Sequence, residues 1–85
     1  MLTRKVTILA SNVGLIATSG FGDQLQVQNI GTGVLWVGGD NTVSNTTGFR
    51  VLINETLNLR HWSGEIYGYA DGTNVDIRII EEKLG

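Results

Sequence analysis

The sequence predicts a small all-β domain: an antiparallel β-sandwich or jelly-roll-like barrel of about seven or eight short strands. Apolar and polar residues alternate with a period of two over several segments, as they do on a half-buried strand. Turn sequences rich in glycine and asparagine separate these segments at intervals of about eight to twelve residues. The chain has 85 residues, and we expect a single domain over residues 1–85.

Three strands are expected in the first half of the chain. They cover residues 5–8, 24–29 and 34–37. The first is a short alternating segment, and residues 1–5 could instead form an N-terminal arm. In the second, three glutamines alternate with Leu25 and Val27, which predicts one polar and one buried face. The third is a continuous apolar run, which is typical of a strand covered on both faces.

Four further strands are expected in the second half. They cover residues 51–53, 56–60, 65–70 and 74–79. The first is an apolar run, the second and fourth alternate, and the third is rich in aromatic residues, which favour strands. Asp71-Gly72 predicts a tight hairpin between the last two, because a type I′ turn needs positive φ at both central positions. Residues 81–84 have helical propensity but are too few to nucleate a helix.

Charge and cysteine content exclude several kinds of site. The net charge is −2, and the six basic residues are scattered, so we expect no direct binding to nucleic acid. The chain has no cysteine, which excludes disulfides and thiolate metal sites. The single histidine, His61, cannot supply an ordinary zinc pattern or, without a nucleophile motif, a catalytic base. We therefore expect neither a cofactor nor an enzyme.

The sequence also bears on membranes and self-association. No run approaches about 18 continuous apolar residues, so no transmembrane helix is expected. The N-terminus resembles a signal peptide only in part, because Ser11, Asn12 and Gly14 interrupt its apolar stretch. Small domains without disulfides or metals commonly gain stability by forming oligomers. We therefore expect this chain to gain stability by associating with other protein chains.

A series of motifs runs through residues 24–81. In order, it comprises residues 25–31 (LQVQNIG), 34–38 (VLWVG), 43, 47–49 (TGF), 51–52 (VL), 55–59 (ETLNL), 64–70 (GEIYGYA) and 75–81 (VDIRIIE). This series resembles small β-sandwich virion proteins of tailed bacteriophages. Residues 53–55 stand where that family usually has a Pro-Gly or Ala-Gly turn, and Gly68 stands where it often has alanine.

The resemblance implies a non-enzymatic virion protein, of the capsid decoration (cement) type or a related head or tail accessory type. Such proteins are commonly homotrimers that clamp coat subunits. The implied partners are further copies of the chain and the major capsid protein or another virion protein. The implied location is the virion, on the capsid surface or the tail, after synthesis in the cytoplasm of the bacterial host.

The candidate contact residues lie where core patterning explains the sequence least. These regions are the N-terminal segment, the loop over residues 40–48, Trp62 and the aromatic strand. Trp62 could instead cover the open end of the sandwich. The candidates are Arg4, Lys5, Asp40, Asn41, Phe49, Trp62, Tyr67 and Tyr69.

Two other interpretations of polar and aromatic residues stay open. Trp36, Tyr67, Tyr69 and Trp62 could form a platform on which a glycan stacks, which would make the chain a carbohydrate-binding module. Tyr67 and Tyr69 lie on the outer face of their strand if Ile66 and Ala70 face the core. Asp40 and Asp71 begin polar turns that each offer one carboxylate, which indicates turn formation rather than a calcium site.

The glutamine face, Gln24, Gln26 and Gln28, is uncharged and polar. Such a face can pair with another subunit without the desolvation cost of buried charge. We also interpret its strand as a weakly protected sheet edge, because it contains neither lysine nor proline. Solvated surface is the alternative interpretation.

Overall fold

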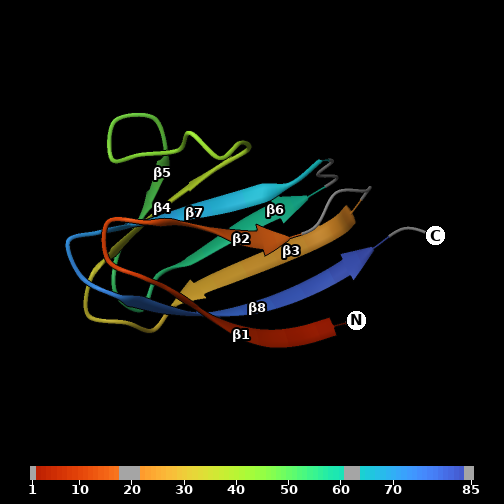
Figure 1. Ribbon diagram of the computed structural model, residues 1–85. Helices are drawn as coiled ribbons and strands as arrows, with labels where there is room; N and C mark the ends of the chain where they lie inside the picture. The colour runs from red at the N-terminus through yellow and green to blue at the C-terminus, as the bar shows by residue number, and fades with distance from the viewer. Residues whose placement is uncertain (1, 18–21, 61–63, 84–85) are drawn as a thin grey trace.

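Eight β-strands form two four-stranded antiparallel sheets (Figure 1). The computed structural model describes residues 2–17, 22–60 and 64–83. The strands are β1 (Leu2–Ile8), β2 (Val13–Ala17), β3 (Gly22–Asn29), β4 (Val34–Gly38), β5 (Phe49–Val51), β6 (Thr56–Arg60), β7 (Ile66–Asp71) and β8 (Val75–Lys83). No helix in the described part of the chain is long and apolar enough to cross a membrane.

The strand order is β1-β8-β3-β6 in the first sheet and β2-β7-β4-β5 in the second. Consecutive strands therefore alternate between the sheets, except for β4 and β5, which are neighbours in the second sheet. The first and last strands, β1 and β8, lie side by side (Figure 1). This arrangement is a jelly roll, and it confirms the predicted all-β sandwich of seven or eight strands.

The predicted hairpin at Asp71-Gly72 is wrong. Gly72 has a φ of +85°, so the turn does use the left-handed conformation that the sequence indicates. However, β7 and β8 belong to different sheets, and the turn carries the chain from one layer to the other. A turn sequence specifies local backbone angles and leaves open which sheet the next strand joins.

The hydrophobic core lies between the sheets and uses the inward side of each alternating strand. Leu25 and Val27 of β3 belong to the same buried cluster as Leu35 of β4, which lies in the second sheet. Gly68 in β7 allows close packing, because a Cβ atom there would lie 2.8 Å from Cδ1 of Ile16. The buried cluster comprises Ile8, Ile16, Ala17, Leu25, Val27, Leu35, Val37, Val51, Ile66, Ala70, Val75, Ile77 and Ile79.

Asn29 is a fully buried polar residue at the end of β3. Its Nδ2 donates to the carbonyl oxygens of Gly33 and Val51, each at 2.9 Å. Its Oδ1 accepts a hydrogen bond of 2.9 Å from the backbone N–H of Gly31. Asn29 therefore holds together the β3–β4 connection and the end of β5, and its polar atoms are satisfied, as buried polar groups require.

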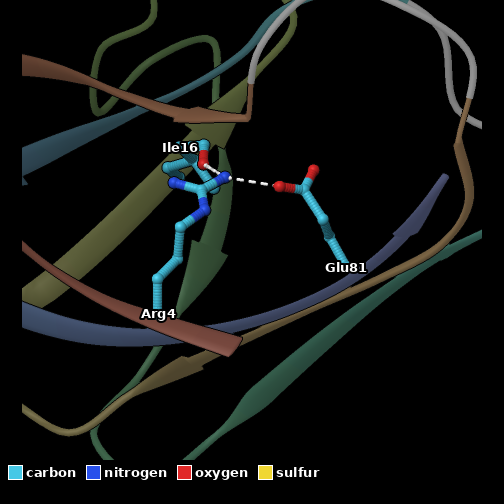
Figure 2. A network of polar contacts seen from close by, with 3 residues as sticks. All are labelled: Arg4, Ile16 and Glu81. Carbon is cyan, nitrogen blue, oxygen red and sulfur yellow. Dashed lines mark hydrogen bonds and ion pairs between the residues drawn. The ribbon is translucent and has the colours of Figure 1, made fainter. Parts of the chain in front are cut away.

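Arg4 connects the two sheets from the inside (Figure 2). Its side chain extends from β1, and Nη2 forms an ion pair of 2.9 Å with Oε1 of Glu81 in β8. The same nitrogen donates to the carbonyl oxygen of Ile16 in β2, on the other sheet. The side chain of Glu81 is only 4% exposed, against 30% for Arg4. Glu81 also has a second oxygen, Oε2, which is buried without a hydrogen-bond partner among the described residues.

Several strand boundaries differ from those expected. Residues 2–5 form part of β1 and pair with β8, so they are not a separate arm. The sequence patterns missed β2 altogether. The strand expected at residues 51–53 is β5, which ends at Val51, and Leu52 and Ile53 are exposed. Residues 81–83, which carry helical propensity, extend β8 instead, because they pair with β3 and β1.

Candidate functional site

The outer side of the second sheet carries aromatic residues. In β7, Ile66, Gly68 and Ala70 are buried, while Tyr67 and Tyr69 are half-buried and point to the opposite side. Both tyrosines therefore point outward, as the sequence predicts. The cause is the two-residue period of a strand, which places alternate side chains on opposite faces.

Strand register brings further residues to this side of the sheet. Val13, Tyr69, Trp36 and Arg50 are successive partners across β2, β7, β4 and β5. Leu15 lies opposite Tyr67 in the adjacent row. Side chains of directly paired residues lie on the same side of a sheet and interact. We name this surface the aromatic face, which comprises Val13, Leu15, Trp36, Arg50, Tyr67 and Tyr69.

The aromatic face is only partly covered by the rest of the chain. Val13 is 37% exposed and Leu15 is 39% exposed, although both are apolar. The indole nitrogen of Trp36, Nε1, is buried and has no hydrogen-bond acceptor among the described residues. The accessible part of the half-buried Trp36 side chain therefore excludes its N–H group.

The loop between β4 and β5 lies beside this face (Figure 1, yellow-green to green). Val43 in this loop is buried, and a Cβ atom at Gly38 would lie 2.7 Å from Cγ2 of Val43. A Cβ atom at Gly48 would lie 2.9 Å from Cβ of Trp36 and 2.9 Å from Cγ2 of Val43. The glycines let the loop pack against β4 and so limit how far Trp36 is exposed.

The hydroxyl of Tyr67 donates a hydrogen bond of 2.9 Å to Oε1 of Glu65. This hydrogen bond raises the pKa of Tyr67 above its ordinary value, because ionisation of the phenol would remove the donor. Partial desolvation and the negative charge of Glu65 act in the same direction. Tyr67 is therefore a neutral hydrogen-bond donor at neutral pH.

Asp40 and Asn41 are exposed at the start of the same loop. The carboxylate of Asp40 accepts hydrogen bonds from the hydroxyl and the backbone N–H of Thr42. These hydrogen bonds lower the pKa of Asp40, with the hydroxyl as the larger cause. Within the described residues, no three His, Cys, Asp or Glu side chains gather closely enough to hold a metal ion. Asp40 acts as a turn residue in this geometry.

The other candidate contact residues are dispersed over the molecule. Phe49 is 72% exposed at the start of the edge strand β5. Lys5 is exposed on the outer side of the first sheet, far in the fold from the aromatic face. Arg4 forms its ion pair with Glu81, and 30% of its side chain remains exposed. Trp62 and His61 lie outside the described residues.

The glutamine face lies on the outer side of the first sheet. Leu25 and Val27 are fully buried, and Gln24, Gln26 and Gln28 point away from the core, as the alternation predicts. The interpretation of this strand as a sheet edge is wrong, because β3 pairs with β6 on one side and with β8 on the other. The backbone of β3 therefore cannot accept a further strand.

Sequence patterns missed Val13, Leu15 and Arg50 as members of the aromatic face. Val13 and Leu15 do alternate with Gly14 and Ile16, which is a strand signal. Arg50 carries no such signal, since its position beside Trp36 depends on the pairing of β5 with β4.

Comparison with known proteins identifies the fold. No protein-family model matches the sequence, and no curated protein matches it. The chain is similar to the solution NMR structure of a de novo designed double-stranded β-helix, with a TM-score of 0.66 and 18% identity over 96% of this chain and 100% of that chain. It is also similar to the crystal structure of PirA, with a TM-score of 0.67 and 16% identity over 94% of this chain and 93% of that chain. The chain therefore has a β-sandwich fold of the double-stranded β-helix, or jelly-roll, type.

Proposed function

We propose that this chain is a non-enzymatic structural protein of a bacteriophage virion, of the capsid decoration type. In this proposal the protein binds the coat lattice as an oligomer, with a homotrimer expected, and the aromatic face is its principal protein interface. The motif order over residues 24–81 supports the virion assignment through its resemblance to such proteins. The partly exposed aromatic face is the observation that carries the proposal of a protein interface.

The composition of the aromatic face suits a protein partner. Tryptophan, tyrosine and arginine are the residue types most enriched among those that dominate binding energy at interfaces. Here Trp36, Tyr69 and Arg50 lie in one row across three strands. Val13 and Leu15 extend the face with exposed apolar surface. Burying such surface removes it from water, at a gain of about 25 cal/mol per Å².

The dimensions of the molecule are sufficient for such an interface. A stable protein–protein interface covers about 800 Å² on each partner. The extents of the chain are 37 × 23 × 16 Å, so one broad side offers an area of that order. Binding energy that exists only in the assembled shell stabilises the shell by mass action. An oligomer that contacts several coat subunits at once adds a high effective concentration.

The test combines light scattering with co-sedimentation on expanded heads of a tailed bacteriophage assembled from coat protein alone. The purified chain should have a mass larger than one chain and should pellet with the heads. The double variant Leu15→Ser with Tyr69→Ser should lose one or both properties, whereas Ile53→Ser, which also replaces an exposed apolar residue, should retain them. A monomer that pellets with no head would contradict the proposal.

Carbohydrate binding is the second candidate function. The observation in its favour is that Trp36, Tyr67 and Tyr69 share one face, since aromatic rings can stack against the apolar side of a sugar ring. Binding on a glycan array that Tyr67→Ala and Tyr69→Ala each abolish, together with no affinity for phage heads, would favour this function over capsid decoration.

A further inference from the structure

The outer side of the first sheet contains an open hollow of about 390 Å³. Six residues line it: Thr3, Gln26, Gln28, Thr56, Arg78 and Ile80. They come from all four strands of this sheet, on the side opposite the core. The hollow therefore belongs to a different sheet from the aromatic face.

The lining residues form two neighbouring rows across the strands. In one row, Ile80 of β8 lies between Thr3 of β1 and Gln26 of β3. In the other row, Arg78, Gln28 and Thr56 are successive partners across β8, β3 and β6. We name these six residues the glutamine hollow. The pairing of the four strands therefore places the six side chains beside one another on one side of the sheet.

Positive charge is concentrated at one side of the glutamine hollow. Lys5 is the direct register partner of Arg78, and both side chains are exposed. Like charges directly opposite each other in a sheet are destabilising. Asp76, two residues before Arg78 in β8, is the register partner of Thr7 and accepts a hydrogen bond of 2.6 Å from its hydroxyl. Among the described side chains, no carboxylate lies within ion-pair distance of either cation. An anionic ligand would relieve the repulsion between them.

The remainder of the lining is neutral and mixed in character. The side-chain amides of Gln26 and Gln28 line the hollow, and an amide offers both donors and an acceptor. Ile80 is apolar and 37% exposed. A saccharide presents vicinal hydroxyls to amides and a C–H face to an apolar side chain. A carboxylate on the sugar ring would meet Arg78, whose guanidinium can bind it in a bidentate manner.

We propose that the glutamine hollow is a binding site for an acidic saccharide, a sugar chain whose rings carry carboxylates. Arg78 and Lys5 bind the carboxylate, Gln26, Gln28 and Thr56 bind hydroxyls, and Ile80 contacts the apolar side of a ring. A nucleic acid fits this site less well, because recognition of a phosphate backbone uses several cations in a row, whereas the described side chains place two here, Lys5 and Arg78. The site is independent of the aromatic face and goes beyond capsid decoration.

The experiment is an NMR titration of the ¹⁵N-labelled chain with tetragalacturonate, followed by isothermal titration calorimetry. The backbone signals of β3 and β8 and the side-chain amides of Gln26 and Gln28 should shift in a saturable manner. Parallel titrations use neutral cellotetraose, sodium acetate and a short DNA duplex as probes. We expect each of the three probes to bind at least about tenfold more weakly. Cellotetraose lacks the carboxylate, acetate lacks the sugar ring and its hydroxyls, and a DNA duplex needs a longer row of cations than Lys5 and Arg78 supply.

Matched variants separate this site from general electrostatic attraction. Arg78→Gln should weaken binding of tetragalacturonate at least about tenfold. Arg60→Gln, which removes the same charge from the same sheet outside the hollow, should leave it unchanged. Both variants should keep the wild-type melting temperature to within a few degrees and the wild-type oligomeric mass, because both residues are exposed.

Four results would overturn the proposal. They are no saturable binding by the wild type, equal binding of cellotetraose, equal or tighter binding of DNA, and equal losses in Arg78→Gln and Arg60→Gln. None of these results bears on the aromatic face, so the two proposals can fail separately.

Discussion

Replacement of Arg4 by methionine removes the cation that joins the two sheets and leaves Glu81 inside the sandwich. Glu81 is 4% exposed, and one of its oxygens already has no hydrogen-bond partner among the described residues. Removing one member of a buried ion pair costs about 3–5 kcal/mol. Because Arg4 is itself 30% exposed, we expect Arg4→Met to cost about 3 kcal/mol of the free energy of unfolding.

That cost is large for a chain of this size. At about 0.05–0.15 kcal/mol per residue, 85 residues correspond to a free energy of unfolding of about 4–13 kcal/mol. A loss of about 3 kcal/mol would lower the melting temperature by about 12–24 °C. Circular dichroism during heating and urea titration at neutral pH would measure both quantities.

Replacement of the other member of the ion pair, Glu81, should cost less stability than replacement of Arg4. In Glu81→Leu, the guanidinium of Arg4 can reach water and still donates to the carbonyl oxygen of Ile16, so the loss should be about 1 kcal/mol. The double variant Arg4→Met with Glu81→Leu should lie within about 1 kcal/mol of the wild type or be more stable, because an apolar pair avoids the desolvation of two charges. Arg60→Met is the control for loss of an exposed arginine.

A loss below about 1 kcal/mol in Arg4→Met would refute the reasoning, because it would mean that Glu81 gains little from its partner. A double variant less stable than Arg4→Met alone would refute it as well, since the carboxylate would then be favourable without a cation. Both comparisons require that the slope of the urea transition stays constant.

Two further predictions concern single side chains. Asn29→Ala should lower the free energy of unfolding by about 3 kcal/mol, because it leaves buried backbone groups of the β3–β4 connection and β5 without partners. Urea titration measures this loss, and a change below about 1 kcal/mol would contradict the prediction. Glu65→Gln should lower the pKa of Tyr67 toward its ordinary value, as followed by ultraviolet titration of the phenol. In the wild type, the hydrogen bond from Tyr67 to Glu65 stabilises the fold below the ordinary tyrosine pKa and is lost as the pH rises through the raised pKa of Tyr67. An unchanged Tyr67 titration in the variant would exclude Glu65 as the cause.

Local patterns in the sequence were sufficient for much of the secondary structure and for the faces of single strands. The alternation around Leu25 and Val27 predicted a polar glutamine face, and that around Ile66 and Ala70 predicted two outward tyrosines. Both predictions depend on the two-residue period of an extended backbone, which holds whatever the strand packs against.

Patterns of this kind could not assemble the candidate sites. The aromatic face needs β4 between β7 and β5, and the glutamine hollow needs β8 between β1 and β3. The ion pair between Arg4 and Glu81 has the same cause, because the pairing of β1 with β8 places both residues on the same side of the first sheet.

Residue patterns alone predict short strands with one apolar side each, in a chain without cysteine and with a net charge of −2. Which strands are neighbours follows only from the folded arrangement, which pairs Leu2 with Glu81 from opposite ends of the chain. The two kinds of information differ in their distance along the chain. Alternation is a property of adjacent residues along one backbone, whereas strand order results from burial of all the apolar sides together in a single core.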